Sequence, residues 1–432
     1  MDLLIENGLI YDDGHFHHDN IHVDQGKIVA VNNRSVPSKK RMDAQGKKIF
    51  PGLIDPHVHF SLNLGEFTSR DDFFHGGKAA AFGGVTTIID FLDPVDNSDD
   101  LKTAYHRRLA QAKPSPVDYL FHATIKNPKC DLESFVKTML DLGLHSLKLF
   151  TTYSDSNRRT NDDDIRALLR LSEKYGFLLE AHIENDDLIN NNPDVHFSKL
   201  GTMRPTEAET TEALKLAQFV EEEGGYLYMV HLSSGDTLEA LKKYYDHLLN
   251  NRFFIESCPH YFYLTNDLFH RPDGYLYTMA PPVRSVAEKQ KLRRLFSDVH
   301  TIGTDHCSFF KKDKHHALLK DIPLGIGGIE QSFLLMHQLY GIDVVPKMTA
   351  RLARLHGLEG RKGKISAGYD ADFFLFEEKK HRLSTNHGAT DYNVYDGMSV
   401  DGKITDTFIG GHHVVHHDSF HERTGRYLGG IL

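Results

Sequence analysis

The sequence lacks the features that mark several protein classes. Its 432 residues include no tryptophan and only three cysteines, Cys130, Cys258 and Cys307, which are too few for a disulfide framework. No uncharged apolar run approaches the ~18 residues of a membrane span. The first residues, Met-Asp-Leu-Leu-Ile-Glu, carry acids where a signal peptide carries bases. We therefore expect a cytoplasmic protein with no membrane partner.

Charge and composition exclude further classes. The formal net charge of −10 makes the chain a poor non-specific partner for nucleic acid. Hydrophobic residues make up 40% and charged residues 25%, and this balance excludes disorder, collagen and coiled coil as the main class. A chain of this length suggests two to four domains, or one large barrel with an appendage.

Histidine is unusually abundant, with 29 copies. Some form adjacent pairs: His17-His18, His315-His316, His412-His413 and His416-His417. Histidine-rich tracts bind metal in some proteins, but adjacent side chains rarely share one face, so we interpret these pairs as solvated surface. The histidines that bear on function lie in apolar strands instead.

Both ends of the chain are rich in short β-type segments. In residues 1–50 these segments are separated by turn signals such as Asp12-Asp13-Gly14. Residues 360–432 likewise contain short β-type segments, separated by the turn signals Asp401-Gly402 and Gly410-Gly411. Chain termini are often close together, so we predict that 1–50 and 360–432 pair into one small sheet domain.

The middle of the chain, residues 51–359, alternates between apolar β-type runs and helical patterns. The runs are Lys48–Phe60, Val85–Phe91, Val117–Ile125, Ser146–Phe150, Phe177–Ile183, Tyr226–Leu232, Arg252–Tyr261 and Val299–Cys307. Such alternation predicts parallel strands with right-handed crossovers, which close into a (β/α)8 barrel. The alternative is an open doubly wound sheet, but no Gly-x-Gly-x-x-Gly follows a strand and opens a helix. We predict an α/β fold with a catalytic barrel.

Imidazole and carboxylate groups recur where these strands end. The first strand ends in His57-Val58-His59, and residues i and i+2 of a strand point to one face. His182, His231 and Asp305 end three further runs. Chemistry in barrels lies at the carboxyl ends of the strands, and neutral imidazole with carboxylate suits zinc, manganese, iron or nickel. These residues are candidate metal ligands.

Lys148 lies in the middle of the apolar strand Ser146–Phe150. A buried ammonium is costly, and burial lowers its pKa. The side chain could form an ion pair, a Schiff base with a substrate, or a carbamate with carbon dioxide. Charge counting favours the carbamate if the site holds two divalent cations. The carbamate is an anion and offsets part of their charge, whereas a Schiff base would add a further cation beside them.

These motifs together resemble the amidohydrolase superfamily, and most closely its cyclic amidohydrolase branch of dihydropyrimidinases, hydantoinases, dihydroorotases and allantoinases. The resemblance rests on Pro51-Gly52-Leu53-Ile54-Asp55-Pro56-His57-Val58-His59, Ser-Leu-Lys148-Leu-Phe, His182, Val-His231-Leu-Ser-Ser, Gly-Thr-Asp305-His-Cys, and Gly363-Lys364-Ile365 through Asp372. It implies a barrel with a β-sandwich, a small cyclic amide substrate and a homo-oligomer, either dimer or tetramer.

The resemblance also implies the site. His57, His59 and Asp305 would hold one divalent metal ion, and His182 and His231 would hold another. N6-carboxylated Lys148 and a hydroxide would bridge the two ions, which we expect to be zinc, with manganese, cobalt or iron as alternatives. The bridging hydroxide would attack the ring carbonyl.

Two residues would act on the substrate in the resembling enzymes. Asp305 would take the proton of the hydroxide and pass it to the leaving nitrogen. Tyr153 would donate a hydrogen bond to the developing oxyanion.

The substrate is expected to be a neutral hydantoin or dihydropyrimidine ring. Dihydroorotases carry an arginine two residues after the second histidine of the motif, and here Ser61 stands there. Ser61, Asn63, Ala280 and Leu324 are the candidate substrate contacts, although hydantoinases usually have serine and asparagine at the last two positions. A dihydroorotase or allantoinase, a non-catalytic dihydropyrimidinase-related scaffold, and a Schiff-base enzyme that uses Lys148 are the alternative interpretations.

Overall fold

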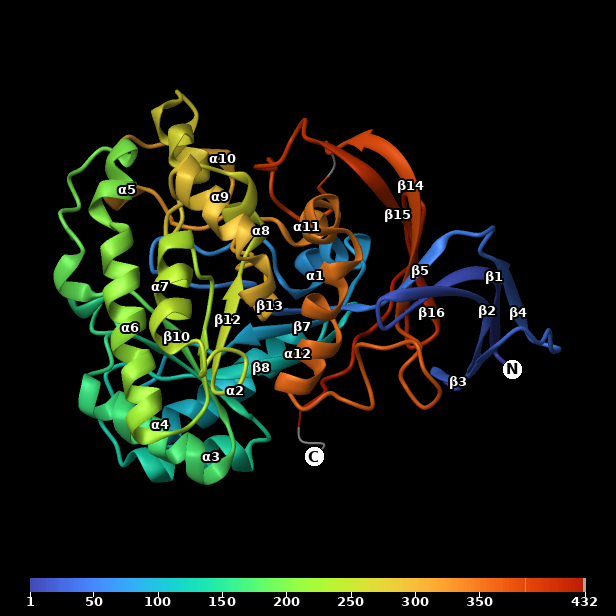
Figure 1. Cartoon of the computed structure of the whole chain (residues 1–432), viewed down its shortest axis with the longest axis horizontal. Helices are drawn as coiled ribbons and strands as arrows, with labels where there is room; N and C mark the ends of the chain where they lie inside the picture. Colours follow the sequence, from blue (N-terminus) through green and yellow to red (C-terminus); the bar gives the residue numbers. More distant parts are fainter. Residues whose placement is uncertain (385, 430–432) are drawn as a thin grey trace.

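The computed structural model describes residues 1–384 and 386–429, which fold around two β-sheets (Figure 1). One sheet has eight strands in the order β6 to β13, and its paired neighbours run parallel. The other has nine strands drawn from both ends of the chain. The predicted α/β class, a (β/α)8 barrel with a small β-sandwich from both chain ends, is confirmed.

The barrel strands are short and buried on both faces, as parallel strands covered by helices must be. They are β6 (Leu53–Val58), β7 (Val85–Phe91), β8 (Asp118–Thr124), β9 (Ser146–Phe150), β10 (Leu178–His182), β11 (Leu227–Met229), β12 (Phe253–Ser257) and β13 (Thr301–Ile302). The sheet closes beyond β13, where His306 bridges to Val58 of β6 and accepts a hydrogen bond from the backbone of His59 at 2.9 Å. The closure therefore adjoins the predicted metal ligands.

Helices cover the outside of the barrel (Figure 1). The longer ones are α1 (Phe73–Phe82), α2 (Ser98–Ala112), α3 (Leu132–Asp141), α4 (Asp162–Tyr175), α6 (Thr206–Glu223), α7 (Gly235–Tyr245), α9 (Val286–Arg294), α11 (Ser332–Tyr340) and α12 (Ala350–Leu355), and the single turns are α5 (Leu200–Met203), α8 (Pro259–Tyr263) and α10 (Lys311–Lys314). Among the described residues, no helix combines the length and the hydropathy needed to cross a bilayer.

Local signals explain where these helices begin and end. Helix α4 has three aspartates in its first turn and ends at Gly176 in the left-handed region, with φ 73°. Helix α7 starts at Ser234, whose side chain accepts hydrogen bonds from the backbone of Asp236 and Thr237. Helix α7 ends at Tyr245, because the following residues form tighter turns.

The second sheet joins the two ends of the chain, which lie side by side in blue and red in Figure 1. Its strands are β1 (Leu3–Asp12), β2 (His15–Asp24), β3 (Lys27–Asn32), β4 (Lys40–Asp43), β5 (Lys48–Pro51), β14 (Phe373–Arg382), β15 (Ser399–Ile409), β16 (His412–His416) and β17 (Ser419–Phe420). Strand β5 links the halves, since it pairs with β1 on one side and β14 on the other. The boundaries at 50/51 and 359/360 stay a prediction.

Three predicted segments differ from the structure. The run Lys48–Phe60 is divided between the sheets at Gly52, where a Cβ atom would lie 2.3 Å from Thr86. The run Arg252–Tyr261 ends as a strand at Ser257 and turns into α8, which begins with a proline. Gly402 lies inside β15 rather than at a turn, with no room for a side chain against Phe376.

The histidine pairs lie at the surface, as expected, although two of these residues share one buried carboxylate. A bulge between Thr407 and Phe408 accompanies the pairing of β15 with β16. His413 Nε2 and His416 Nδ1 both lie on the buried Asp406 carboxylate, at 2.9 and 2.8 Å. These two imidazoles stabilise the sheet.

A buried lysine connects the barrel to the second sheet. Lys362 Nζ lies 2.7 Å from Asp118 of β8 and 3.1 Å from Asp370, and it also contacts Asp372, the residue before β14. Arg426, near the carboxyl end, adds ion pairs of 2.7 Å to Asp118 and Asp370. These three buried carboxylates are thus compensated by Lys362 together with Arg426 and Lys27.

We expect Lys362→Met to lower the free energy of unfolding by about 3 kcal/mol, because it leaves the buried Asp372 carboxylate without its counter-charge. Urea denaturation followed by circular dichroism measures the change. Lys364→Met, at an exposed position two residues away, is the control and should change stability by less than about 0.5 kcal/mol. Equal stability of both variants would show that the network contributes nothing.

Candidate metal centre

The predicted ligands converge at the carboxyl ends of the barrel strands. Six side chains from five different strands, or from the residues just beyond them, line one cavity of about 360 Å³: His57, His59, Lys148, His182, His231 and Asp305. The volume is typical of a site for a small organic molecule. The sequence interpretation placed these residues together, and the structure brings all six to this cavity.

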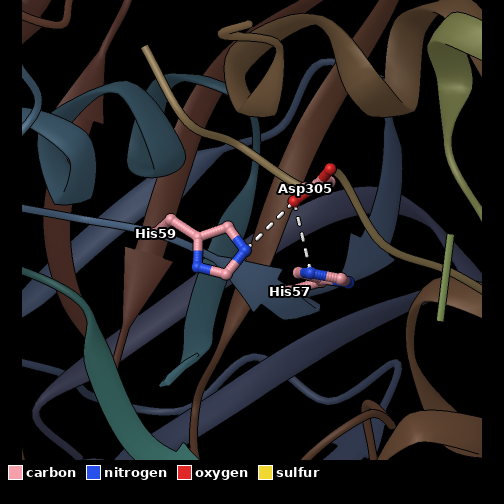
Figure 2. Close-up of side chains that lie close together, drawn as sticks. All are labelled: His57, His59 and Asp305. Carbon is pink, nitrogen blue, oxygen red and sulfur yellow. Dashed lines mark ion pairs between the residues drawn. The ribbon is translucent and has the colours of Figure 1, made fainter. Parts of the chain in front are cut away.

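His57, His59 and Asp305 form the first group (Figure 2). Asp305 Oδ1 lies 3.2 Å from His57 Nε2 and 3.1 Å from His59 Nε2. The other ring nitrogen of His57 faces Glu256 of β12 at 2.9 Å. If His57 Nδ1 donates to Glu256, the Nε2 lone pair is directed toward Asp305, and the three side chains can hold one cation between them.

His182 and His231 form the second group. His182 Nδ1 and His231 Nε2 face each other at 3.0 Å. The opposite nitrogen of His182, Nε2, lies 2.6 Å from Glu184. A proton on Nε2, donated to this carboxylate, leaves Nδ1 free as a ligand atom beside His231.

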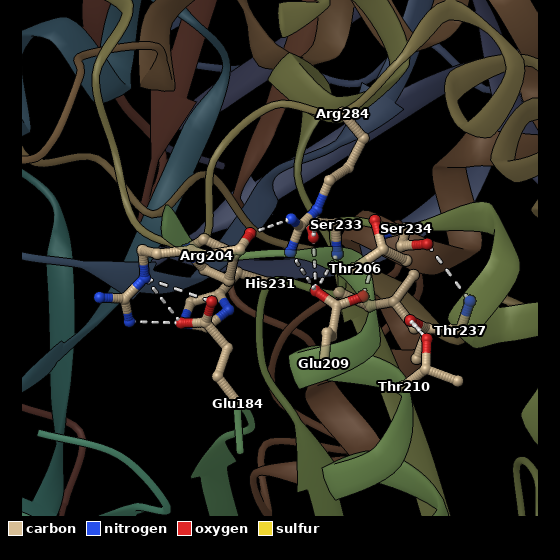
Figure 3. Close-up of polar contacts among 12 residues, drawn as sticks. Glu184, Arg204, Thr206, Glu209, Thr210, His231, Ser233, Ser234, Thr237 and Arg284 are labelled. Carbon is tan, nitrogen blue, oxygen red and sulfur yellow. Dashed lines mark hydrogen bonds and ion pairs between the residues drawn. The ribbon is translucent and has the colours of Figure 1, made fainter. Parts of the chain in front are cut away.

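Glu184 is itself held by an arginine (Figure 3). Arg204 Nη2 donates to Glu184 Oε2 at 2.5 Å, and Arg204 Nε lies 3.2 Å from both carboxylate oxygens. Burial opposes the charged form of Glu184, but Arg204 outweighs it and holds the pKa of this carboxyl well below its usual range. Glu184 therefore stays ionised and keeps the His182 ring oriented.

A second buried carboxylate fixes the segment that follows His231 (Figure 3). Glu209 of α6 accepts hydrogen bonds from the backbone N–H groups of Ser233 at 3.0 Å and Ser234 at 3.1 Å. Arg284 Nε donates to the Ser233 hydroxyl at 2.8 Å. His231 has a φ of 41°, so these contacts help to hold a backbone conformation that is unfavourable for a non-glycine residue.

Lys148 is buried, with only 3% of its surface exposed, and its Nζ lies 5.2 Å from the centre of the Phe91 ring. Burial lowers the pKa of this amine to about 8, against the opposing influence of Glu180 and Glu256. A larger fraction of the amine is therefore neutral near pH 7 than for a free lysine. The neutral form is the one that reacts with carbon dioxide.

Three of the four imidazoles are kept neutral. Burial lowers the pKa of His59 to about 4, and it also lowers the pKa of His182 and, strongly, that of His231. His57 is the exception, because Glu256 and Asp305 outweigh burial and raise its pKa to about 9. Neutral imidazoles are what a metal ion requires, and the carboxylates that raise the pKa of His57 are the groups that would attract a cation to this position.

The donor set therefore fits divalent cations. Four imidazoles and one carboxylate converge, and His182 and His231 present ring nitrogens to each other. Imidazole and carboxylate are ligands that zinc and related ions accept.

Tyr153 lies at the same cavity, directly after β9. Its ring is 5.1 Å from that of His182, and the Arg204 guanidinium lies 4.9 Å from the ring centre. Burial raises the pKa of Tyr153, against the influence of Arg204, so the hydroxyl stays protonated and can donate a hydrogen bond. Tyr153 has a φ of 68° and Asp305 a φ of 50°, and such strained backbone is typical of functional sites.

Most predicted substrate contacts line this cavity. Asn63, Ala280 and Leu324 do so, together with Leu62, Leu64 and Phe67 of the loop after β6. Ser61 is not among the lining residues. Its backbone has a φ of 49° and donates to the carbonyl of Asp71, which sets the direction of the loop at this point.

The sequence interpretation missed Glu184, Arg204 and Glu256. Glu256 was detectable, because it is the single charged residue in the apolar segment Phe253–Ser257. Glu184 stands two residues after His182, outside the strand. Arg204 follows 20 residues later, directly after α5. No spacing in the sequence reveals that these two side chains meet.

Comparisons with known proteins show which chains this one resembles. The model of the amidohydrolase family matches residues 49–414. The chain is 31% identical to a D-hydantoinase of Geobacillus stearothermophilus, over 98% of this chain and 95% of that protein. It is 30% identical to a D-phenylhydantoinase of Escherichia coli, over 99% of this chain and 97% of that protein. The structure of a D-hydantoinase (dihydropyrimidinase) from a Thermus species superposes with a TM-score of 0.92 and 29% sequence identity. The match covers 99% of this chain and 98% of that chain.

We expect Glu184→Gln to weaken the binding of divalent cations at His182 and His231 by about 10- to 100-fold, because the imidazole loses the carboxylate that orients it. Titration of the metal-free protein with cobalt, followed by its absorption spectrum, measures the affinity. Glu207→Gln, an exposed position on α6, is the control. Unchanged affinity in Glu184→Gln would contradict the role of this carboxylate.

Proposed function

The chain belongs to the amidohydrolase family, and on that premise we propose that it hydrolyses the ring amide of hydantoins or dihydropyrimidines. It is a hydrolase that acts on cyclic amides. The observation that carries the proposal is the convergence of four histidines, Asp305 and Lys148 at one cavity. The likeness to hydantoinases along nearly the whole chain supports the choice of ring.

We propose that His57, His59 and Asp305 hold one divalent cation and that His182 and His231 hold another. Lys148, converted by carbon dioxide to the N6-carboxylate, would contact both, and zinc, manganese, cobalt or iron suits the donors. Two such cations would lower the pKa of water and polarise the ring carbonyl. The oligomer, dimer or tetramer, and the cytoplasmic location stay predictions.

Asp305 is proposed to move the proton. Its carboxylate faces the imidazoles of His57 and His59, and although burial opposes ionisation, these two residues hold the pKa of Asp305 well below its usual range. Asp305 therefore starts the reaction ionised, accepts the proton of the attacking water, and returns it to the ring nitrogen that leaves. Because its pKa is low, it holds the proton only briefly.

Tyr153 is proposed to stabilise the negative charge that develops on the carbonyl oxygen. Its protonated hydroxyl is available as a donor, and the ring is held between His182 and Arg204. A fixed donor is effective because it needs no reorganisation when the charge forms. The apolar side chains Leu62, Leu64 and Phe67 would exclude bulk water from the ring.

A panel of cyclic amides tests the proposed function. The protein, loaded with zinc, manganese or cobalt, would be given dihydrouracil, hydantoin, allantoin or dihydroorotate. The loss of ultraviolet absorbance would measure the rate of ring opening. We expect hydantoin or dihydrouracil to be opened fastest. Preference for dihydroorotate or allantoin would identify a different ring, and no turnover of any ring would contradict the proposal.

We expect Lys148→Ala to lose nearly all activity and to bind fewer metal ions per chain, because no carboxylate joins the two groups of ligands. Short carboxylic acids such as propionate should restore part of the activity by occupying the vacated volume. Activity assays with metal analysis by mass spectrometry measure both effects. Lys137→Ala, at an exposed position, is the control, and full activity of Lys148→Ala would refute the bridge.

We expect Tyr153→Phe to lower kcat by about a hundredfold with little change in KM, because the lost hydrogen bond acts mainly in the transition state. Steady-state kinetics on the best ring of the panel separate the two constants. Tyr244→Phe, 57% exposed, should behave as the unmodified protein. A change confined to KM would instead assign Tyr153 to substrate binding.

A further inference from the structure

Arg158 is a half-buried cation that lines the candidate active-site cavity. Its guanidinium lies 5.9 Å from the centre of the Tyr153 ring. Across the part of the chain that the structure describes, no carboxylate comes within ion-pair distance of it. A charged group against apolar walls is unfavourable unless an opposite charge or water satisfies it.

The other charged groups near the mouth are already engaged. Lys320 also lines the cavity, but its Nζ is paired with Asp194 at 2.6 Å. Arg159, next in the chain, is paired with Asp186 at 3.4 Å. Asp305 lies between the two imidazoles of the first metal group. Apart from Lys148, which is assigned to the metal centre, Arg158 is thus the lining lysine or arginine, among the described residues, that remains available to a bound molecule.

The loop that carries Arg158 is held in place by its own hydrogen bonds. The backbone N–H of Arg158 donates to the carbonyl of Tyr153 at 3.0 Å, and that of Thr160 donates to Phe150 at 2.8 Å. Asp186 accepts from the Thr152 hydroxyl at 2.9 Å. The guanidinium therefore projects from a backbone that is anchored beside Tyr153, so a ligand at this tyrosine would meet it without a large rearrangement.

We propose that Arg158 binds a carboxylate carried by the substrate, so that the preferred ring bears an anionic substituent. The inference rests on the proposed function and narrows its substrate class. Arginine binds carboxylates through two parallel hydrogen bonds, and the methylene groups of a short substituent would pack against Leu62, Leu64 and Phe67. The arginine expected in dihydroorotases is missing at Ser61, and Arg158 supplies a cation from a different loop.

A matched pair of ligands isolates this charge. Hydantoin-5-acetate and hydantoin-5-acetamide have nearly the same shape and differ in one negative charge. We expect the metal-loaded protein to bind the acetate about tenfold more tightly by calorimetry. Arg158→Gln should remove the difference, Arg158→Lys should keep part of it, and added salt should reduce it. Kinetics on the same pair should place the effect in KM.

Arg159→Gln is the control. It also removes one positive charge, but the Arg159 side chain does not line the cavity. Equal affinity of the unmodified protein for both ligands, or a preference that survives in Arg158→Gln, would overturn the inference. Dihydroorotate is a further ligand for the same measurement. If it binds more tightly than the two hydantoins, and Arg158→Gln removes that difference in affinity, the carboxylate that Arg158 binds is attached to the ring itself. Binding without turnover would contradict the proposed function and leave the role of Arg158 supported.

Discussion

The Lys148 side chain is buried at the mouth of the barrel, and the charges around it follow from that burial. An amine in this position has a pKa of about 8 because water is excluded from it. The same exclusion keeps His59, His182 and His231 neutral. Carboxylates stand one layer further out, where Glu256 faces His57 and Glu184 faces His182. The centre thus combines neutral imidazoles and the ionised Asp305 with two carboxylates that surround them, an arrangement that suits cations.

The sequence was sufficient to predict the barrel and the side chains that meet at its rim, for a simple reason. Strand side chains alternate between two faces, so His57 and His59 had to point the same way. Parallel strands all end at one rim, so His182, His231 and Asp305 had to meet. These relations depend only on local periodicity and on the order of the strands.

The outer residues of the site could not be predicted in this way. Glu184 and Arg204 lie on irregular segments, where no periodicity relates position in the chain to position in space. The end of β12 was misjudged for a related reason, because the apolar run continues into α8 and periodicity alone does not separate a buried strand from a short buried helix. The division of the first run at Gly52 arises from a close approach to Thr86 that exists only after folding.

Ligand atoms and cavity walls come from different parts of this fold. The proposed ligands stand at the ends of strands that form a hydrogen-bonded barrel, whereas Leu62, Leu64, Phe67 and Arg158 stand on two loops outside these strands. Loops tolerate substitution and changes in length far better than the strands that carry them. A lineage with this architecture can therefore acquire a preference for a new ring by altering a few loop residues, while the bond-breaking apparatus is inherited intact.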